Sequence, residues 1–440
     1  QLEAIVRQLN ATPGAAETTK AVDHSQTRDR ERVLSHLSTI LGRSFEETVL
    51  AYDALQAGGN SNSGLLSIIY WLGQLAIEES QGAGDRRVLF SPTLQERVGH
   101  HIHGECWAED VKQFLRQHGL WQRPLHIISA NLHSVVNSVF APAALQQLEQ
   151  PIEAIAQELN RSDDTSAAAR ILTYAQAHGL SELVDQAGTN INVQIFDTLK
   201  FDLDQLAPEL GVDRQRLKAE QPVLLVMDYP FGEQAFELMD ELLKPLEVEG
   251  EALKLNVASI SVMGKAGTLV GHKGDLLIPT AHIFEGTADN YPLANDLSLS
   301  DFQECGLPVY EGAFVTVLGT SLQNADVLAY FQSSSWNVIG LEMEGAHLQK
   351  AIQAAAQIRK SIAERVTVRY AYYASDNPLL TGTTLASGSL GQVGVKPTYL
   401  ITVKFLQKIL GTATAAHPLS LAALEVNSQL DTRSVMSLGS

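Results

Sequence analysis

The chain has 440 residues, of which 45% are hydrophobic and 18% charged, and its formal net charge is −19. This composition excludes wholesale disorder, collagen and coiled coil, and the length predicts two domains or more. A surface this acidic repels phosphate backbones and argues against nucleic-acid binding, although a local cluster of cations would still admit a small phosphorylated ligand.

The cysteine content and the hydropathy indicate a compartment. Only Cys106 and Cys305 are present, which excludes a disulfide scaffold and predicts a reducing cytoplasm. No window approaches about 18 uninterrupted apolar residues, so we expect no transmembrane helix and no membrane partner. The first residues lack a basic region followed by an apolar one, so we expect no signal peptide there, and the initial Gln indicates that residues can be missing before it.

The first part of the chain, 1–118, predicts a helical N-terminal domain. Apolar residues recur there at helical spacing in several separate runs. These runs are 1–10, 28–41, 45–55, 64–79 and 94–118. Such a domain can regulate, dimerise or cap a neighbour, and the sequence does not decide among these roles.

From about residue 121 the pattern changes to strands that alternate with helices, up to residue 412. The expected strands are 125–128, 192–196, 222–227, 257–263, 275–279, 314–318, 338–341 and 366–373. The expected helices begin at 134 and cover 232–243, 325–333, 344–359 and 400–410, with a helical insertion at 141–190 and a loose tail at 413–440. This alternation predicts an α/β domain with a mixed, largely parallel sheet flanked by helices, whose ligands bind at the carboxyl ends of the strands.

Three stretches of polar and small residues follow expected strands. They are 264–274, 342–347 and 374–379. Taken singly, they are most simply a turn, an acidic helix start and a loop cap. Only their combination and order suggest a common site.

In that order, the stretches resemble the purine nucleoside phosphorylase/nucleosidase superfamily. The chain reads SVMGKAGTLVGHKGDLLI, then VIGLEMEGAH, then YYASDNPL. The superfamily has a strand ending in Gly-Ser-x-Gly, then Val-Glu-Met-Glu-Ala-Ala, then a strand ending in Ser-Asp. The upstream segments LHIISANLHSVVNSVF and VLLVMDYPFGEQAFELMDELL are similar to its first two strand–loop–helix units. The resemblance covers roughly 121–412 and implies a nucleoside phosphorylase-like fold.

Part of this pattern is also similar to bacterial AMP nucleosidases. The run from Ser375 to Leu379 resembles their ending, and those enzymes carry a large extra N-terminal domain. The second similarity leaves open whether a 5′-phosphate belongs to the substrate.

The resemblance implies roles for the acidic residues. Glu344 is expected to hold the ribose hydroxyls, with Met343 beneath the sugar and Glu342 behind it, because a carboxylate stabilises the charge that develops on the ribose. Asp376 is expected to assist the departing base at purine N7, a role that requires a desolvated pocket, and Asn377 to contact the base.

The phosphate-binding part departs from the superfamily. Val262 stands where phosphorylases have Arg, and Lys265 where they have the phosphate-binding Ser. Asn131 and His133 replace the Arg-bearing loop after the first strand, and with Lys265 and Gly264 they remain the candidates for an anion site. Gly264 and Gly267 are expected to let the backbone approach the ligand.

The sequence gives fewer candidates for the residues that contact the base and for the residue that activates the nucleophile. Leu322 stands in the place of a base-stacking Phe, for which Phe284 is the expected substitute. Glu233 and His133 are the candidates for a base that activates water. A histidine-rich stretch at 100–106 matches no zinc pattern, and we interpret it as solvated or as part of a domain interface.

The sequence therefore predicts an enzyme that cleaves the N-glycosidic bond of a purine nucleoside or nucleotide, by hydrolysis or phosphorolysis. No cofactor or metal is expected, the partners are the small molecule and optionally inorganic phosphate, and a homo-oligomer is expected by analogy. The alternatives are a non-catalytic nucleoside-binding protein that retains the fold and, third, a structural subunit that works through its N-terminal helices.

Overall fold

The computed structural model describes residues 26–55, 64–82, 102–161, 165–285, 287, 289–318, 325–380 and 390–411. The expected helix at 1–10, the residue Leu322 and the tail at 413–440 lie outside these ranges. No helix within the ranges has both the length and the apolar character needed to cross a membrane.

Three N-terminal helices pack on one another. They are α2 (Gln26–Leu41), α3 (Phe45–Ala54) and α4 (Gly64–Ser80). Their shared core contains Leu34, Leu37, Tyr52, Leu65 and Ile69. Ser44 begins α3 with a capping box, because its hydroxyl accepts from the Glu47 N–H while the Glu47 carboxylate accepts from the Ser44 N–H. The predicted helices at 28–41, 45–55 and 64–79 are thus confirmed.

The rest of the described chain is built on a ten-stranded sheet with the order β11-β10-β8-β12-β7-β1-β4-β3-β2, on which β9 pairs with β8. Its strands are β1 (Leu125–Ser129), β2 (Leu180–Leu183), β3 (Val193–Asp197), β4 (Val223–Met227), β7 (Val257–Thr268), β8 (Leu276–Phe284), β9 (Asn290–Pro292), β10 (Val309–Thr316), β11 (Val338–Glu342) and β12 (Thr367–Asp376). A separate hairpin consists of β5 (Leu246–Val248) and β6 (Glu251–Leu253).

The sheet is mixed, as predicted, and one part of it closes on itself. β1 runs parallel to β4 and β7, β12 runs parallel to β7, and β10 runs parallel to β8 and β11. β11 also pairs antiparallel with the end of β7, at Leu341 and Gly267. The strands β7, β12, β8, β10 and β11 therefore form a closed ring, which brings the ends of β11 and β12 to the same strand.

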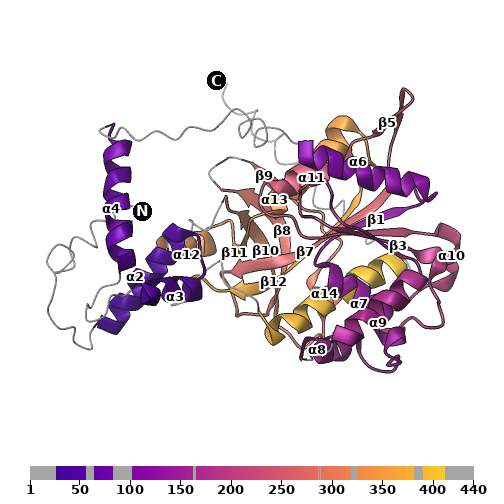
Figure 1. Cartoon of the computed structure of the whole chain (residues 1–440), viewed down its shortest axis with the longest axis horizontal. Coiled ribbons are helices and arrows are strands. Elements are labelled where there is room, and N and C mark those ends of the chain that lie inside the picture. Colours follow the sequence, from indigo (N-terminus) through magenta and orange to yellow (C-terminus); the bar gives the residue numbers. More distant parts are fainter. Residues whose placement is uncertain are drawn as a thin grey trace, which may run out of the picture.

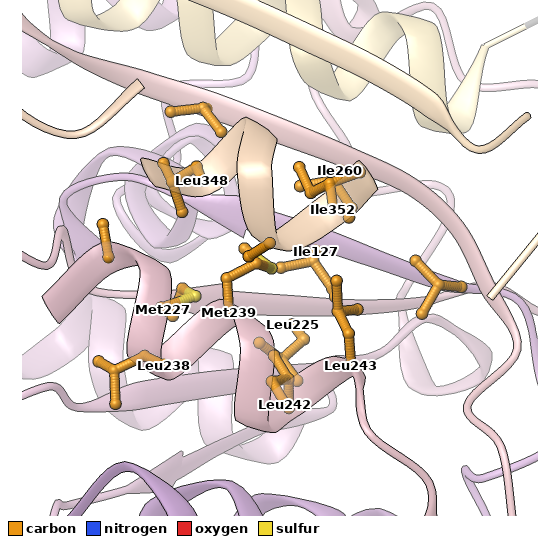
Figure 2. Packing of buried hydrophobic residues seen from close by; sticks show 14 of the residues in the cluster. Ile127, Leu225, Met227, Leu238, Met239, Leu242, Leu243, Ile260, Leu348 and Ile352 are labelled. Atoms are coloured by element: carbon orange, nitrogen blue, oxygen red, sulfur yellow. The ribbon is translucent and has the colours of Figure 1, made fainter. Parts of the chain in front are cut away.

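One face of the sheet carries α6 (Ile102–Gln117), α11 (Gln234–Leu243) and α13 (Gly345–Gln353). Figure 2 shows Leu238, Met239, Leu242 and Leu243 of α11 and Leu348 and Ile352 of α13 gathered around Ile127, Leu225 and Ile260 of the strands. The segments that precede the two helices also meet, because the Gly232 N–H donates to Glu344 at 3.0 Å. α6 belongs to this core as well, since the Trp107 indole donates to the carbonyl of Ile191 at 2.8 Å. The last helix of the predicted region 1–118 thus packs with the α/β part.

The opposite face carries the remaining large helices (Figure 1). They are α7 (Leu132–Ala144), α8 (Ile152–Arg161), α9 (Thr165–Ala177) and α14 (Gln392–Leu410). The α/β part also contains two shorter α-helices, α10 (Arg214–Glu220) and α12 (Ala325–Ser333). The segment 141–190, which we expect to be an insertion, holds α8, α9 and the edge strand β2, and its status as an insertion stays a prediction.

The predicted strands and helices of the α/β part are confirmed in their main parts, and three predictions differ from the structure. The segment 141–190 is not helical throughout, because it contains the strand β2. The Gly264–Gly267 turn predicted after a strand ending at 263 is wrong, because β7 continues as a strand to Thr268. Ladder bonds to β12 and β11 on either side hold these residues extended. The helix predicted over 344–359 changes after Gln353 into a π-helical stretch, Ala354–Arg359.

Candidate active site

The end of β7 is the meeting point of the two acidic segments. Gly267 pairs with Asp376 of β12 on one side and with Leu341 of β11 on the other. Since neighbouring strands lie about 4.8 Å apart, the Cα atoms of Asp376 and Leu341 are separated by roughly 10 Å, and Glu344 follows three residues later. Ring closure thus brings the two sequence-predicted carboxylates to one end of the sheet.

Glu344 is the residue before α13 and is 5% exposed. Its Oε1 accepts from the Gly232 N–H at 3.0 Å, and its Oε2 accepts from the Met343 N–H at 3.3 Å. Burial, and then the charge of Glu342, raise the pKa of Glu344 to about 7, against the lowering effect of these hydrogen bonds. Glu344 is therefore a carboxyl group that changes charge near neutral pH.

Glu342 ends β11 and is 3% exposed. Its Oε2 accepts from the N–H groups of Glu344, at 2.6 Å, and Gly345, and its Oε1 accepts from the Thr316 hydroxyl. Burial by itself would raise the pKa of Glu342, but the hydrogen bond and charge of His282, together with Thr316 and the Gly345 N–H, lower it. Glu342 is thus an ionised group that holds the first turn of α13.

Tyr229 lies between β7 and Glu344, on the loop from β4 to α11. A Cβ on Gly264 would lie 2.7 Å from the Tyr229 hydroxyl oxygen, so only glycine leaves room for this ring. Burial and the charges of Glu344 and Glu342 raise the pKa of Tyr229 well above its usual value, so its hydroxyl stays a neutral donor. In the structure the space at Gly264 that we expected the ligand to use is filled by Tyr229.

Asp376 is the last residue of β12 and is 4% exposed. Its Oδ1 accepts from the Ser375 hydroxyl, which also contacts the carbonyl of Ala266 at 3.1 Å. The side chain of Asn377 donates to the Gly271 carbonyl at 3.2 Å and accepts from the Leu379 N–H at 3.0 Å. Asp376 therefore has the desolvated environment that its predicted role requires, whereas Asn377 here holds the loop.

Three neighbouring strands end in a row beside Glu344. Phe284 of β8 is opposite Thr316 of β10, and Thr316 is opposite Glu342 of β11. The Phe284 ring meets the His347 ring edge to face, with centroids 4.7 Å apart. Phe284, predicted to contact the base, thus borders the acidic cluster, while Met343 packs partly buried against an apolar group that includes Leu341.

The residues predicted to bind phosphate do not form a cationic site with the two glutamates. Lys265 is exposed, and because side chains alternate along a strand it faces away from the Gly264 side, where Tyr229 lies. Asn131 is the N-cap of α7, where its Oδ1 accepts from the Ser134 N–H at 3.0 Å, and His133 is exposed. Val262, in the place of the expected Arg, is fully buried in the core.

The paired arginines lie away from this cluster. Arg123 pairs with Asp197 at 2.8 Å near the amino end of β4, and Arg369 pairs with Asp296 at 2.8 Å from the middle of β12. Glu233, a candidate base, is exposed one residue before α11 and acts electrostatically on His347. The charges that act most on Glu342 and Glu344 are those of the two glutamates themselves and His282.

The sequence analysis missed the residues that surround the glutamates. Tyr229 and Gly232 belong to a segment that we interpreted only as a Gly-rich turn, and His282 lies in an apolar strand. A single histidine in the apolar run LLIPTAHIF is the one signal that pointed to a buried polar contact. Of the histidine-rich stretch, 100 and 101 lie outside the described residues, while the His103 Nδ1 contacts the Ala187 carbonyl at 2.5 Å.

The cluster is closed in this structure. Two surface hollows are formed elsewhere, one by α8 residues such as Glu158 and Arg161, the other before β1 and β7 by residues such as Trp121 and Lys254. Over the described ranges, no three His, Cys, Asp or Glu residues come close enough to hold a metal ion. Glu344 and Asp376 are thus buried, and the Gly232 N–H covers Oε1 of Glu344.

Comparison with known proteins gives one family and distant structural likenesses. Residues 153–411 match a family of unknown function, DUF6909. No curated protein matches the chain. The family match includes all of the acidic cluster described above.

Three solved structures illustrate the likenesses. A futalosine hydrolase mutant of Helicobacter pylori is 10% identical over 65% of this chain and 100% of its own, with a TM-score of 0.36. The 5′-methylthioadenosine/S-adenosyl homocysteine nucleosidase of Campylobacter jejuni is 11% identical over 65% of this chain and 98% of its own, with a TM-score of 0.37. The AMP nucleosidase of Bacteroides thetaiotaomicron is 14% identical over 61% of this chain and 89% of its own, with a TM-score of 0.32. At this distance the activities of those proteins do not carry over to this chain.

Proposed function

The chain belongs to the family of unknown function DUF6909, so its activity has to be argued from its own site, and we propose that it hydrolyses the N-glycosidic bond of a purine nucleoside. The observation that carries the proposal is the convergence of two buried acidic residues, Glu344 and Asp376, on the end of β7. Cleavage of this bond requires such a pair, one group for the sugar and one for the base.

Glu344 would hold the ribose. In its ionised form it accepts hydrogen bonds from the 2′ and 3′ hydroxyls, and these strengthen as positive charge develops at C1′. The Gly232 N–H that now occupies Oε1 at 3.0 Å would give way to a hydroxyl donor. Met343 would lie under the sugar, and Tyr229 would donate toward the same carboxylate.

Asp376 would assist the base. The bond between C1′ and N9 breaks, its electron pair passes to the purine, and a proton from Asp376 to N7 neutralises the leaving group. Water adds to C1′ and yields the free sugar. Phe284 borders the site on the side of β8 and is the aromatic residue available for the base.

Two observations favour water over phosphate as the acceptor. No arginine faces the acidic pair among the described residues, and Lys265 is directed to the other face of the sheet. A phosphate dianion beside Glu342, Glu344 and Asp376 would be repelled, because among the described residues neither an arginine nor Lys265 is placed to offset the three carboxyl groups. The same argument favours an uncharged nucleoside over a 5′-monophosphate.

The test is release of free base from a panel of nucleosides and their 5′-monophosphates, each with and without inorganic phosphate. We expect release from a nucleoside that does not depend on phosphate, and a loss of release in Glu344→Gln and Asp376→Asn. Glu247→Gln, in the exposed β5–β6 hairpin, is the matched control. Release that requires phosphate would make the protein a phosphorylase instead.

A second candidate, a nucleoside-binding protein without turnover, is favoured by one observation. Glu344 is already satisfied by two main-chain donors, and the site is closed. This candidate predicts binding of a nucleoside by calorimetry with no release from any substrate, and Glu344→Gln would then weaken binding without changing a rate.

A further inference from the structure

His282 is a completely buried histidine that the proposed chemistry does not use. It lies in β8 with 0% exposure, and its Nδ1 is 3.3 Å from Oε1 of Glu342. The rings of Tyr370, Phe314 and Tyr372 surround it, with centroids 5.1, 6.1 and 6.1 Å away. Within the described part of the chain neither ring nitrogen has a hydrogen-bond partner of regular geometry, so the contact of Nδ1 with Glu342 is its nearest polar one.

Burial of this imidazole among aromatic rings is unfavourable unless a polar contact compensates for it. Burying a polar ring without partners is unfavourable by about 1–3 kcal/mol, so a histidine persists there only when one of its contacts compensates. The contact with Glu342 is the only polar one that the described residues offer to this ring. We therefore expect His282 to act through its contact with Glu342.

Glu342 in turn fixes the main chain around Glu344. Its Oε2 accepts from the N–H of Glu344 at 2.6 Å and from the N–H of Gly345, and Thr316 donates to Oε1. The Thr316 hydroxyl also accepts from the Ala346 N–H at 3.0 Å. These bonds define where α13 begins and in which direction the Glu344 side chain leaves it.

Glu342 can hold these N–H groups at low energetic cost only if its buried carboxylate is itself paired. A carboxylate with 0% side-chain exposure is strongly destabilised unless it is paired and hydrogen-bonded. The other titratable groups that interact with it are Glu344, a like charge, His347, whose pKa burial lowers, and Tyr229, Tyr370 and Tyr372, which burial keeps neutral. His282, with its Nδ1 3.3 Å from Oε1, is the histidine that contacts Glu342 directly.

The fit of the ring to the start of α13 is specific. A Cβ at Gly345 would lie 2.2 Å from Cε1 of His282 and 2.7 Å from the Tyr372 hydroxyl oxygen. The imidazole therefore occupies the volume that any other residue at 345 would need. Position 345 must therefore be glycine as long as His282 is present.

We infer that His282 is a positioning residue, which holds Glu342 ionised and, through the two N–H groups that Glu342 accepts, fixes Glu344 for the ribose. The inference rests on the proposed function, because it assigns His282 to the same site. It predicts that removal of the imidazole acts on turnover through displacement of Glu344, without any contact between His282 and substrate.

The first test compares two substitutions of His282. His282→Leu removes the donor, and we expect kcat/KM to fall about 100-fold, the usual effect of displacing a catalytic group by about 1 Å. His282→Asn places an amide nitrogen near the position of Nδ1, and we expect it to keep kcat/KM within tenfold of the wild type. His118→Asn, on the exposed end of α6, is the control. A folded His282→Leu protein with wild-type kcat/KM would overturn the inference.

The second test needs no activity. A double-mutant cycle in urea unfolding, with His282→Leu and Glu342→Gln, should be strongly non-additive if the two groups are paired. The ¹⁵N signals of the His282 imidazole should shift in Glu342→Gln, because the carboxylate beside Nδ1 is lost. Additive substitutions together with unchanged imidazole signals would refute the pairing.

The two tests separate this inference from the proposed function. A wild-type protein that releases no base, yet shows the coupling and the shifted imidazole signals, would refute the nucleosidase and retain the His282–Glu342 pair. Base release without coupling would retain the nucleosidase and refute the role of His282.

Discussion

The sheet contains two buried histidines, His126 in β1 and His282 in β8. They differ in how completely the polar groups around them are hydrogen-bonded and paired. The Nδ1 of His126 is 2.7 Å from the Ser259 hydroxyl, Arg369 donates to the same hydroxyl at 2.9 Å, and Arg369 pairs with Asp296 at 2.8 Å. Burial, then the charges of Arg369 and Arg216, lower the pKa of His126 to about 3. His126 is therefore uncharged at neutral pH, beside an arginine that is paired with a carboxylate.

The region around His282 is different. It contains two buried carboxyl groups, one of them with a pKa of about 7, and beside them the buried hydroxyls of Tyr229 and Tyr372. Clustered buried ionisable groups with a shifted pKa are typical of functional sites, while a satisfied network is typical of a structural one. The comparison indicates where a ligand is expected. It is expected at the carboxyl end of the closed ring of strands, and not at the network around Arg369.

The largest expected effect is that of Glu344→Gln. The neutral amide loses the charge that stabilises the transition state, so we expect base release to fall about 1,000-fold. The folded-state pKa of Glu344, about 7, is above its unfolded value, so ionisation destabilises the fold at pH values above 7 and has no effect below pH 4. Unfolding in urea should therefore show the variant to be more stable than the wild type at pH 9, by about 3 kcal/mol, and equal to it at pH 4. Equal stability at both pH values would contradict the buried charge.

In the network around Arg369, we expect Asp296→Ala to have the opposite effect: it should lower stability and leave turnover unchanged. The substitution leaves the guanidinium, 7% exposed, without its carboxylate, and we expect a loss of about 3 kcal/mol in the free energy of unfolding with no change in turnover of the folded protein. Asp204→Ala removes the exposed pair with Arg214 and should change stability by less than about 1 kcal/mol. Loss of activity in folded Asp296→Ala would show that the two regions are not independent.

The pH dependence of turnover is the next largest effect. Because Glu344 must be ionised to hold the ribose and its pKa is about 7, kcat/KM should fall about tenfold per pH unit below pH 7. Glu342→Gln removes the negative charge that raises the pKa of Glu344, so the acid limb should move to lower pH in that variant. An acid limb that stays near pH 7 in Glu342→Gln would assign it to another group.

The smallest effect is expected from Gly232→Ala. Gly232 has a φ of 58°, in the left-handed region, and donates its N–H to Glu344. Alanine there is disfavoured by about 1 kcal/mol, and open space around the position means that strain is the only penalty. We expect a small loss of stability and a lower KM, because the closed loop competes less well with substrate for Glu344. A raised KM would show that Gly232 assists binding instead.

How far the site could be predicted depends on the range of the contacts involved. Glu342, Met343 and Glu344 could be placed between a strand and a helix because the apolar run before them and the helical spacing after them are local signals. Asp376 could likewise be placed at a strand end. The extension of β7 through Gly264 and Gly267 could not be predicted, since two glycines are a turn signal unless strands on both sides hold them extended.

By itself the sequence determined the alternation of helices and strands, the mixed α/β class, the two acidic strand ends and the absence of an arginine pair for phosphate. The tertiary structure alone decided that β11 closes onto β7, which brings Asp376 and Leu341, three residues before Glu344, to the same residue, Gly267, and that Lys265 faces the other side of the sheet. It alone placed Tyr229 over Gly264 and His282 against Gly345. The physical reason is that local periodicity encodes which residues are buried, whereas strand order and the packing of side chains against glycines join residues far apart in the sequence, on which periodicity carries no information.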